Sequence, residues 1–486
     1  MGIVIIYGMA LLIWSNHRII DGDEGYYASA ARLVAEGKMP YLDFFYPQSP
    51  MLPFVYGAWS ILTGHSLISF RILSALLTAV TAALWAWYLL KEYCGSVWIA
   101  LTTLLVLLLN PFFASWGVTV KTYALGNFLV TVTLISIWRG EITVDKRWWV
   151  AGGVASGLLV SSRLLYAAVP LAIICWMLLS HDSVANHRLR KPGWFALGLV
   201  VASVPAILLF LQNPDGFVFN NVGYHLQRSE GLPLTVRASS DMAFLFATFV
   251  SHPYMILQFV LAGFGMLSLF GKKTISLGVV SLISMLALVL ASLTPIPHYE
   301  QYLTSPLTPF FVPLVGLGAQ RLWERSRIVV ATSCIVALFL SAFELNIETK
   351  ASSLTRGWDL ATYEDVTNYI RVHTTASDTI LSLWPGYVFE SGRKHLPGLE
   401  NHFGILAARG LTPEQRQHYH IAGMDMIISA IEHKRPTMVI IGTWVGPFFE
   451  TLGDEGRQRV GGILSEHYRL TTQIGKVDIY ERESPP

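Results

Sequence analysis

The chain opens with MGIVIIYGMALLIWSNHRIIDGDEGYY (residues 1–27), an apolar segment followed at once by an acidic run. Three carboxylates, Asp21, Asp23 and Glu24, lie within four residues just after the apolar segment ends. Ionisable clusters at the point where a chain leaves a membrane are costly and are usually functional. This opening predicts a membrane protein with chemistry at the membrane surface.

The composition is that of an integral membrane protein with polar parts. Of 486 residues, 53% are hydrophobic and 14% are charged, whereas a soluble domain carries about 25% charged residues. The net charge of +2 gives no indication of a nucleic-acid partner. The 14 His residues form no HExxH motif and no other tight ligand spacing, so we predict no cofactor, with a divalent metal left open. The first segment lacks a basic n-region and a small-residue cleavage site, which favours a retained helix over a signal peptide.

Apolar stretches recur along the first 346 residues. A bilayer span needs about 20 residues, and we expect a polytopic α-helical membrane domain, residues 1–346, with eleven spans. The stretch 148–180 is either one long helix or two short ones. We favour two, turning at Ser161-Ser162-Arg163, because a single helix would leave Arg163 in hydrocarbon. The expected spans are 1–19, 67–90, 96–112, 119–138, 148–162, 164–180, 194–212, 242–270, 274–293, 303–320 and 328–346.

Lys and Arg residues are concentrated in alternate loops. With the N-terminus inside, the five inside loops hold 12 Lys/Arg among 37 residues, whereas the long outside loop 16–66 holds three. This distribution follows the positive-inside rule. It predicts that the loop 16–66 and the polar tail 347–486 lie on the same outer side of the plasma (cytoplasmic) membrane.

The loop 16–66 is predicted to be structured. Asp23 can cap a short helix that ends before Gly37 and Pro40. A carboxylate at a helix N-terminus stays ionised, because the helix dipole favours its charge. Residues 41–59 mix aromatic residues with prolines, which suits a helix lying at the membrane interface.

The tail 347–486 is predicted to be a separate, small, extracytoplasmic α/β domain. Strands expected at 379–383, 438–442 and 476–480 alternate with helices expected at 362–372, 412–433 and 455–466. The segment Trp384-Pro385-Gly386-Tyr387 is either an ordinary strand-to-helix turn, which we favour, or a flap that closes over an acceptor.

The acidic run carries the candidate catalytic groups. If the donor is a sugar on a lipid phosphate, the leaving group needs no protonation. The reaction then needs a carboxylate to take the acceptor proton and cations to hold the departing phosphate. The alternative is that one acid caps the helix and the others are solvated. Candidate cations at outer helix ends, each of which could instead snorkel to lipid headgroups, are Arg71, Lys121, Arg163 and His298. Residues that either line the same cleft or belong to a solvated loop are Tyr224, His225 and Arg228.

A resemblance to a known family is carried by the first outer loop. Its motifs are Asp23-Glu24-Gly25-Tyr26-Tyr27, Gly37-Lys38-Met39-Pro40-Tyr41-Leu42-Asp43-Phe44 and Pro47-Gln48-Ser49-Pro50. This pattern resembles the GT-C glycosyltransferases, nearest to the bacterial relatives of protein O-mannosyltransferases and of the aminoarabinose transferase of lipid A. The resemblance covers about residues 1–350 by topology, and its motifs lie in 21–75 and, more weakly, in 298–302.

The resemblance implies an inverting transferase that uses a polyprenyl-phosphate sugar at the outer face. It gives Asp23 the role of catalytic base and lets Glu24 orient the acceptor or a cation. The further substrate contacts expected in the motifs come from Asp21, Tyr27, Asp43, Gln48 and Tyr302.

Two departures from the family pattern change the expected site. The aminoarabinose enzymes carry a Lys in the Pro-flanked segment of the first loop, where this chain has Gln48 and Ser49. Phosphate binding is therefore expected from Lys121, Arg71, Arg163 or His298. Some relatives place a second acid at the outer start of the fourth span, where this chain has Lys121-Thr122-Tyr123. This departure predicts metal-independent catalysis.

The sequence therefore predicts a glycosyltransferase that acts on a hydroxyl of a glycan, a lipid or a protein. A non-catalytic transporter or flippase for lipid-linked saccharides is the alternative. Transporters often carry inverted repeats with broken helices at the bilayer midplane, and the charged groups here gather at one face instead. A structural or sensor protein is a second alternative, but it would not need the acidic first loop.

Overall fold

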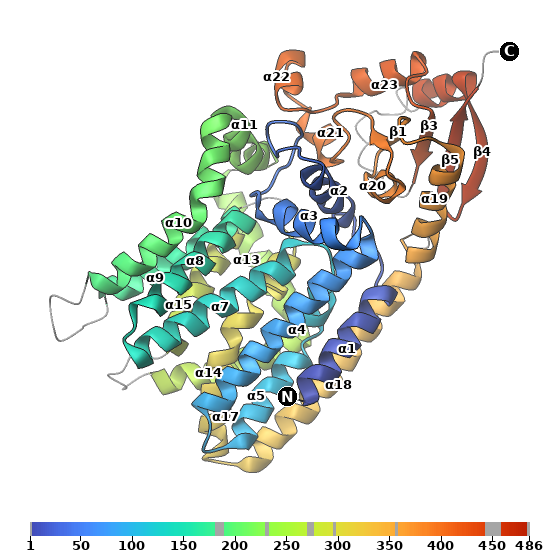
Figure 1. Cartoon of the computed structure of the whole chain (residues 1–486). Coiled ribbons are helices and arrows are strands. Elements are labelled where there is room, and N and C mark those ends of the chain that lie inside the picture. Colours follow the sequence, from blue (N-terminus) through green and yellow to red (C-terminus); the bar gives the residue numbers. More distant parts are fainter. Residues whose placement is uncertain are drawn as a thin grey trace.

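The chain forms a bundle of apolar helices with a smaller α/β domain packed on one end (Figure 1). The computed structural model describes residues 2–179, 189–228, 233–269, 277–294, 298–354, 358–442 and 458–483. In Figure 1, α2 (Glu24–Ala35) and α3 (Met51–Thr63) lie above the bundle, and the sheet and the C-terminus lie at the top. The first loop is thus enclosed between the two parts of the molecule.

Each of the eleven expected apolar stretches contains a helix. The favoured turn at Ser161-Ser162-Arg163 is confirmed, because one helix ends at Ser162 and a 3-10 turn, η1 (Leu164–Ala167), leads into the next. The expected start of a span at residue 119 was too early, since Lys121 only caps the helix that begins at Thr122. The helices are α1 (Gly2–His17), α4 (Leu67–Glu92), α5 (Val97–Leu108), α6 (Pro111–Gly117), α7 (Thr122–Thr143), α8 (Lys146–Ser162), α9 (Ala168–Leu179), α10 (Arg190–Gln212), α13 (Leu234–Ser251), α14 (Pro253–Leu269), α15 (Leu277–Ser292), α17 (Thr308–Trp323) and α18 (Arg327–Leu354).

Two of the expected spans are bent helix pairs. The axes of α5 and α6 differ by 54°, and those of α13 and α14 by 97°. Proline begins the second helix of each pair, at Pro111 and Pro253, and a proline cannot continue a preceding helix. At the first bend, the Asn110 side chain accepts the backbone N–H groups of Phe112 and Phe113, so α6 starts with a satisfied N-terminus.

The helix lengths agree with a multi-pass membrane protein without fixing the number of spans. Three described helices, α4, α10 and the first part of α18, are long and apolar enough to cross a bilayer, or up to five spans if each bent pair counts as one. The shorter apolar helices α1, α3, α15 and the η1–α9 segment have 10–17 residues each. The count of eleven spans remains a prediction.

The first loop contains the two helices expected of it, but Asp23 does not cap α2. Asp23 has helical backbone angles, φ −74° and ψ −20°, and its side chain makes no capping hydrogen bond. The expected interfacial helix is α3, which packs against α2 and α4. Between α10 and α13 the chain adds the short helices α11 (Pro214–Val218), η3 (Phe219–Gly223) and α12 (Tyr224–Gln227).

The tail forms the small α/β domain that the sequence predicts. Its five-stranded sheet has the order β2-β1-β3-β5-β4, with β1, β2 and β3 parallel and β5 antiparallel to both neighbours. Ile380 pairs with Met438 and Val439 with Tyr480 in this register. The elements are α19 (Leu360–His373), β1 (Thr379–Ser382), α20 (Gly386–Ser391), β2 (Lys394–His395), α21 (Phe403–Ala407), α22 (Pro413–His418), α23 (Met424–Glu432), β3 (Met438–Ile441), β4 (Tyr468–Ile474) and β5 (Val477–Arg482).

Two details of the tail differ from the expectation. The helix expected at 412–433 is split into α22 and α23, with Gly423 before the second helix. Two strands, β2 and β4, were not expected. The first residues of the helix expected at 455–466 lie outside the described residues, and residues 458–467 are helical. The expected domain boundary at residue 346 falls inside α18, which continues to Leu354.

The tail domain packs tightly on the first loop through one apolar cluster. Tyr26 of α2, Phe70 of α4 and Phe389 of α20 belong to this cluster, and the rings of Phe70 and Phe389 lie 5.4 Å apart. Arg32 of α2 adds polar contacts, because its guanidinium donates to the carbonyl oxygens of Val388, Phe389 and Arg393 at 2.9–3.2 Å. The tail domain is therefore part of the structure that holds the acidic run.

Candidate active site at the acidic turn

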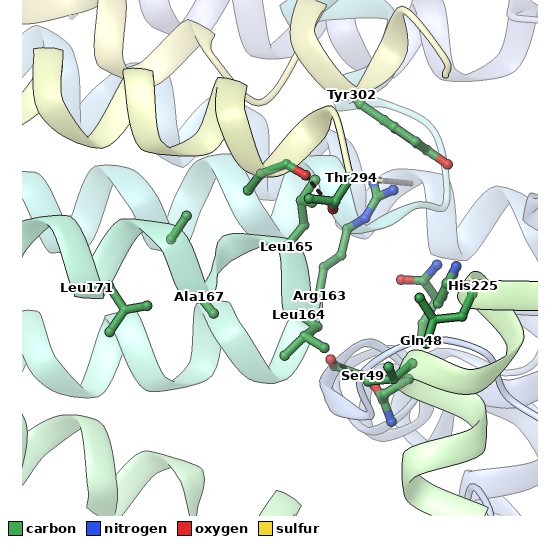
Figure 2. Close-up of a pocket in the computed structure, with 15 residues that line it drawn as sticks. Gln48, Ser49, Arg163, Leu164, Leu165, Ala167, Leu171, His225, Thr294 and Tyr302 are labelled. Atoms are coloured by element: carbon green, nitrogen blue, oxygen red, sulfur yellow. Dashed lines mark hydrogen bonds between the residues drawn. The ribbon is translucent and has the colours of Figure 1, made fainter. Parts of the chain in front are cut away.

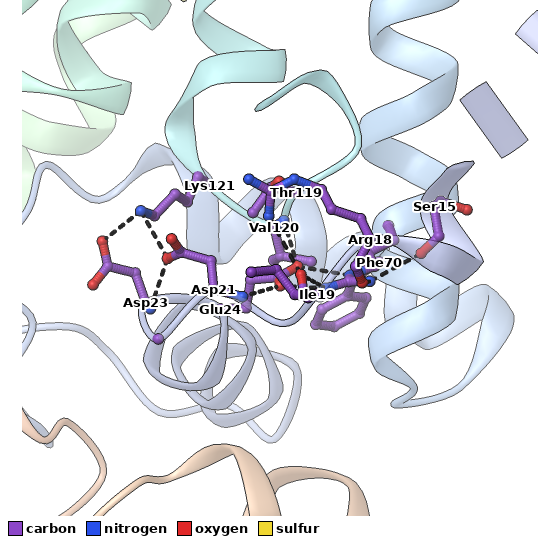
Figure 3. A network of polar contacts seen from close by, with 12 residues as sticks. Ser15, Arg18, Ile19, Asp21, Asp23, Glu24, Phe70, Thr119, Val120 and Lys121 are labelled. Atoms are coloured by element: carbon purple, nitrogen blue, oxygen red, sulfur yellow. Dashed lines mark hydrogen bonds and ion pairs between the residues drawn. The ribbon is translucent and has the colours of Figure 1, made fainter. Parts of the chain in front are cut away.

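The acidic run forms a turn between α1 and α2 that its own carboxylates hold together (Figure 3). Asp21 accepts the backbone N–H of Asp23 at 2.9 Å, and Glu24 accepts the backbone N–H of Asp21 at 2.9 Å. The Glu24 N–H in turn donates to the Asp21 carbonyl at 3.0 Å. These short-range bonds fix the direction in which each carboxylate leaves the backbone.

Glu24 forms a buried ion pair with Arg71. Both side chains are fully buried, and two N–H groups of Arg71 reach the two oxygens of Glu24 at 2.9 and 2.5 Å. Glu24 also accepts the backbone N–H of Val120 at 3.0 Å. The other guanidinium N–H groups donate to the carbonyl oxygens of Ser15, Arg18 and Ile19.

This pair bears on the roles predicted for Arg71 and Glu24. All five N–H donors of Arg71 are engaged by the protein, so Arg71 has no donor left for a substrate phosphate. Glu24 does orient a cation, as the resemblance implied, but that cation is Arg71 inside the fold. The pair therefore joins α1, α2, α4 and the segment before α7.

Lys121 is the cation of the acidic turn. Its ammonium lies 2.7 Å from an oxygen of Asp21 and 2.9 Å from an oxygen of Asp23. Lys121 is 3% exposed, whereas each of the two aspartates keeps 21% of its side-chain surface exposed. The Gln301 side chain accepts a further hydrogen bond from Lys121 at 3.4 Å. Lys121 thus forms ion pairs with both carboxylates, and the two aspartate side chains remain partly exposed.

The two aspartates differ in proton affinity. Burial raises the pKa of Asp23, and the charge of Asp21 raises it further, while Lys121 and Arg163 offset only part of the rise. Burial acts in the same direction on Asp21, but Lys121, helped by Arg18, outweighs it and lowers the pKa of Asp21. Paired acids whose environments separate their pKa values commonly divide the acid–base roles of a site. Asp23 is the more basic carboxylate, contrary to the weakly basic helix cap expected from the sequence.

A cavity with one polar end and one apolar wall has a volume of about 400 Å³ and is lined by Arg163, whose charge also acts on Asp23 (Figure 2). Figure 2 shows Arg163, Tyr302, Gln48 and His225 at one end, with Leu171 at the other. The Arg163 guanidinium lies 4.2 Å from the centre of the Tyr302 ring. The remaining lining residues are Ser49, Leu164, Leu165, Ala167, Ala168, Asn221, Val222, Leu226, Ala291 and Thr294.

Some of the predicted site residues line the cavity or lie near it, and others do not. Gln48, Arg163 and Tyr302 line the cavity, and Tyr27 is buried close enough to Asp23 and Arg163 for both charges to act on it. Of the four candidate cations, Arg163 lines the cavity, whereas Lys121 and Arg71 pair with the carboxylates of the acidic turn.

Two further predicted residues lie away from the cavity. His298 contacts Asp241 at 2.6 Å and stacks on Phe244. Asp43 is exposed and accepts the backbone N–H of Met39 at 2.7 Å, so its carboxylate closes a local turn. Neither His298 nor Asp43 lines the cavity, because a local partner holds each of them elsewhere.

Other residues of the site were left open or missed by the sequence reasoning. His225 lines the cavity, as one alternative had it, and its ring nitrogen lies 3.1 Å from the Pro47 carbonyl oxygen. Burial lowers the pKa of His225 to about 4, so the ring is neutral near pH 7. Ser49 donates to the Asn221 side chain at 3.1 Å, and Asn221 had no signal in the sequence. Trp384 of the tail reaches the Gly22 carbonyl at 2.7 Å, which a strand-to-helix turn alone does not suggest.

The described residues contain no group of three or more His, Cys, Asp or Glu side chains arranged to hold a metal ion. Metal-independent catalysis remains a prediction.

Comparison with known proteins identifies the fold. Residues 47–210 match the family described as dolichyl-phosphate-mannose-protein mannosyltransferase. The crystal structure of ArnT from Cupriavidus metallidurans bound to undecaprenyl phosphate superposes with a TM-score of 0.71 at 14% identity, covering 99% of this chain and 97% of that one. The apo form of that ArnT gives a TM-score of 0.67 at 15% identity with the same coverage.

A more distant structure shares the same architecture. The oligosaccharyltransferase of Archaeoglobus fulgidus gives a TM-score of 0.57 at 12% identity, covering 99% of this chain and 73% of that one. No curated protein matches the chain by sequence. The resemblance stated from the first loop is confirmed at the level of fold: the chain has the GT-C architecture of membrane glycosyltransferases.

Proposed function

We propose that this GT-C-fold chain is an inverting glycosyltransferase that moves a sugar from a polyprenyl-phosphate carrier to an acceptor hydroxyl, with Asp23 as general base. The observation that carries the proposal is that Arg163, which lines the polar end of the cavity, also acts through its charge on Asp23, a carboxylate of raised pKa. A base and a cation on the two sides of one reacting carbon are what this transfer requires.

The cavity suits a lipid phosphate in both shape and chemistry. In the proposal, the phosphate lies against Arg163, with the neutral His225 and the Gln48 amide beside it. The prenyl chain lies along the apolar wall formed by Leu164, Leu165 and Leu171. The shared fold of an ArnT that was solved with undecaprenyl phosphate supports this class of carrier.

The chemical step follows from these positions. The acceptor oxygen forms a bond to the anomeric carbon while the bond from that carbon to the phosphate oxygen breaks, so the configuration inverts. Asp23 takes the acceptor proton, and Lys121 balances the charge of Asp21 throughout. The phosphate leaves as an anion, and Arg163 stabilises its growing charge without donating a proton.

The proposal includes an orientation in the membrane. The positive-inside distribution supports a site and a tail domain on the outer face of the plasma membrane. Acceptors at that face include glycans, lipids and proteins. The fold shared with an ArnT favours the transferase over a transporter or flippase.

The test is sugar transfer in proteoliposomes supplied with membrane-extracted polyprenyl-phosphate sugars and envelope acceptors. The wild-type protein should transfer sugar. Asp23→Asn should lower kcat at least about 100-fold, because general base catalysis contributes about 10²–10⁴-fold. Arg163→Gln should chiefly raise KM for the donor. Glu36→Gln is the control, since Glu36 is exposed and pairs with Arg32 outside the site. Equal turnover of Asp23→Asn and wild type would reject the assigned base, and lipid binding without turnover would favour the transporter.

A further inference from the structure

The tail domain makes a direct contact with the backbone between the two aspartates. The indole N–H of Trp384 donates to the Gly22 carbonyl oxygen at 2.7 Å, in a buried position. Gly22 is the residue that separates Asp21 from Asp23. A bond to its carbonyl fixes the orientation of the peptide plane that joins Gly22 to Asp23.

The fit of Trp384 against the turn leaves no free space. A Cβ atom added at Gly25 would lie 2.7 Å from the Trp384 indole and 2.8 Å from the backbone nitrogen of Gly386. Any side chain larger than hydrogen at position 25 would therefore push the indole away from the turn. Glycine at position 25 of the acidic motif is explained by this contact.

Trp384 itself is firmly held by its own domain. Its ring lies 4.7 Å from that of Tyr387, 5.9 Å from that of Tyr363 and 6.0 Å from that of Trp358. Its carbonyl accepts the Ser382 hydroxyl at 2.7 Å. The indole therefore acts as a fixed point for the turn.

Other contacts from the tail domain reach the same turn. The backbone N–H of Ile20 donates to the Trp358 carbonyl at 2.7 Å, just before Asp21. The ring of His402 lies 5.7 Å from that of Tyr26, just after the turn. The turn is thus held by the tail domain before, at and after the two aspartates.

We propose that Trp384 is a positioning residue for sugar transfer, and that its indole N–H holds the Gly22 carbonyl so that Asp21 and Asp23 both reach Lys121. This inference rests on the proposed function for its catalytic consequence, because Asp23 must be the base for its position to matter. Its structural part stands on the contacts alone. Nothing in the comparison with ArnT or the mannosyltransferase family assigns this role to the residue.

Amide hydrogen exchange of the purified full-length protein tests the structural part without any substrate. Trp384→Phe keeps an aromatic ring but removes the N–H. Because the Gly22 carbonyl then stays buried without its donor, exchange in the peptide 20–28 should rise about tenfold. Tyr363→Phe is the matched control, since it removes the hydrogen bond from Tyr363 to Glu390 in the same aromatic cluster without touching Gly22. Exchange in peptide 20–28 should stay at the wild-type rate in this control.

The kinetic part uses the proteoliposome assay with extracted polyprenyl-phosphate sugars. Trp384→Phe should lower kcat about tenfold, while KM for the donor changes less than about twofold, since the cavity is untouched and the lost bond acts through the base. The acid limb of the kcat/KM profile should also move to higher pH, because Lys121 offsets part of the pKa rise that burial causes at Asp23 and a displaced turn weakens that offset. A general loss of stability would not move that limb.

The outcomes separate this inference from the proposed function. If wild type shows no transfer, the proposed function fails, and the exchange data still decide whether Trp384 holds the turn. Exchange in 20–28 that is unchanged in Trp384→Phe, or raised equally in Tyr363→Phe, overturns the inference. If Trp384→Phe does not fold, Gly25→Ala replaces it, because its Cβ pushes the indole from the other side. Unchanged exchange in that variant likewise overturns the inference.

Discussion

At the scale of single residues, the site depends on how two cations are shared among three carboxylates. Arg71 pairs with Glu24 inside the protein, and Lys121 bridges Asp21 and Asp23 at the surface of the turn. Since the single Lys121 ammonium contacts two carboxylates, its charge cannot fully compensate the charges of both. Burial raises the pKa of Asp23, and the charge of Asp21 raises it further, whereas Lys121 and Arg18 outweigh the effect of burial on Asp21 and lower its pKa.

The pH dependence of transfer should follow Asp23. A base is active when deprotonated, so kcat/KM should rise with pH through the pKa of Asp23, which lies above the ordinary Asp value of about 3.9. Lys121→Met removes the charge that favours the ionised form and should move this rise to higher pH. Lys191→Met is the control, because Lys191 pairs with Glu141 at 3.0 Å away from the turn. A rise that moves to lower pH in Lys121→Met would contradict the assignment.

Removing one partner of the Glu24–Arg71 pair should destabilise the whole chain. An unpaired buried charge costs about 3–5 kcal/mol, so Glu24→Gln and Arg71→Met should each lower the Tm markedly in detergent. The double variant should recover part of the loss, because no uncompensated charge is then buried. Thermal unfolding followed by circular dichroism measures all three. A double variant that loses as much as the two single variants combined would show that the pair does not act as a unit.

At the scale of elements, one helix bend brings a histidine into contact with two glutamates. His252 lies at the 97° bend between α13 and α14, where it contacts Glu300 at 2.9 Å and Glu344 of α18 at 3.2 Å. Glu300 directly precedes α16 (Gln301–Thr304), which supplies the oxygen that contacts Lys121 and the ring that packs on Arg163. Through Glu300, the bend is thus linked to α16, whose Tyr302 lines the cavity.

Loss of His252 should weaken lipid-phosphate binding without touching the cavity directly. His252→Ala leaves Glu300 without its partner, so the segment with Tyr302 gains freedom and Arg163 loses part of its support. Because Glu300 keeps 58% of its side-chain surface exposed, the lost contact is worth at most about 1 kcal/mol, which predicts an increase in Kd for undecaprenyl phosphate of about fivefold. His433→Ala is the control, because the His433 ring contacts only its own helix turn at Ser429 among the described residues. A Kd that stays at the wild-type value would reject this support role.

At the scale of the whole molecule, the tail domain and the helical bundle form one apolar cluster across the first loop. Aromatic pairs such as Phe70 with Phe389 contribute about 0.5–1.5 kcal/mol each beyond their buried area. Arg32 adds three bonds to carbonyl oxygens of the tail domain. The acidic turn is therefore built by both parts of the chain.

Weakening this contact should free the tail domain without unfolding it. Arg32→Met keeps an apolar stem but leaves the carbonyl oxygens of Val388, Phe389 and Arg393 without their donor. Limited proteolysis should then cut faster between α18 and α19, and transfer should fall although the bundle still binds the lipid. Arg459→Met is the control, since Arg459 pairs with Glu432 within the tail domain. Unchanged cleavage in Arg32→Met would show that the apolar cluster alone holds the two parts together.

Much of the fold was predictable because it depends on short-range patterns. The apolar stretches gave helices, and the turn at Arg163 followed from the cost of a charge in hydrocarbon. The short helix α2 and the short, largely apolar runs of β1 and β3 were also local signals. The bend at His252 and the split between α22 and α23 were not predicted, since Pro253 and Gly423 lie in otherwise helical sequence.

The sequence by itself determined that this is a membrane protein with an acidic turn after its first helix and a small α/β tail domain. Local hydrophobicity and motif spacing are enough for that. Only the tertiary structure decided which acid is the basic one and which cation faces the cavity. Glu24 meets Arg71 at a separation of 47 residues and Val120 at 96, and Trp384 meets Gly22 at 362. Contacts at such separations depend on how the helices and the tail domain pack, and no local pattern records that packing.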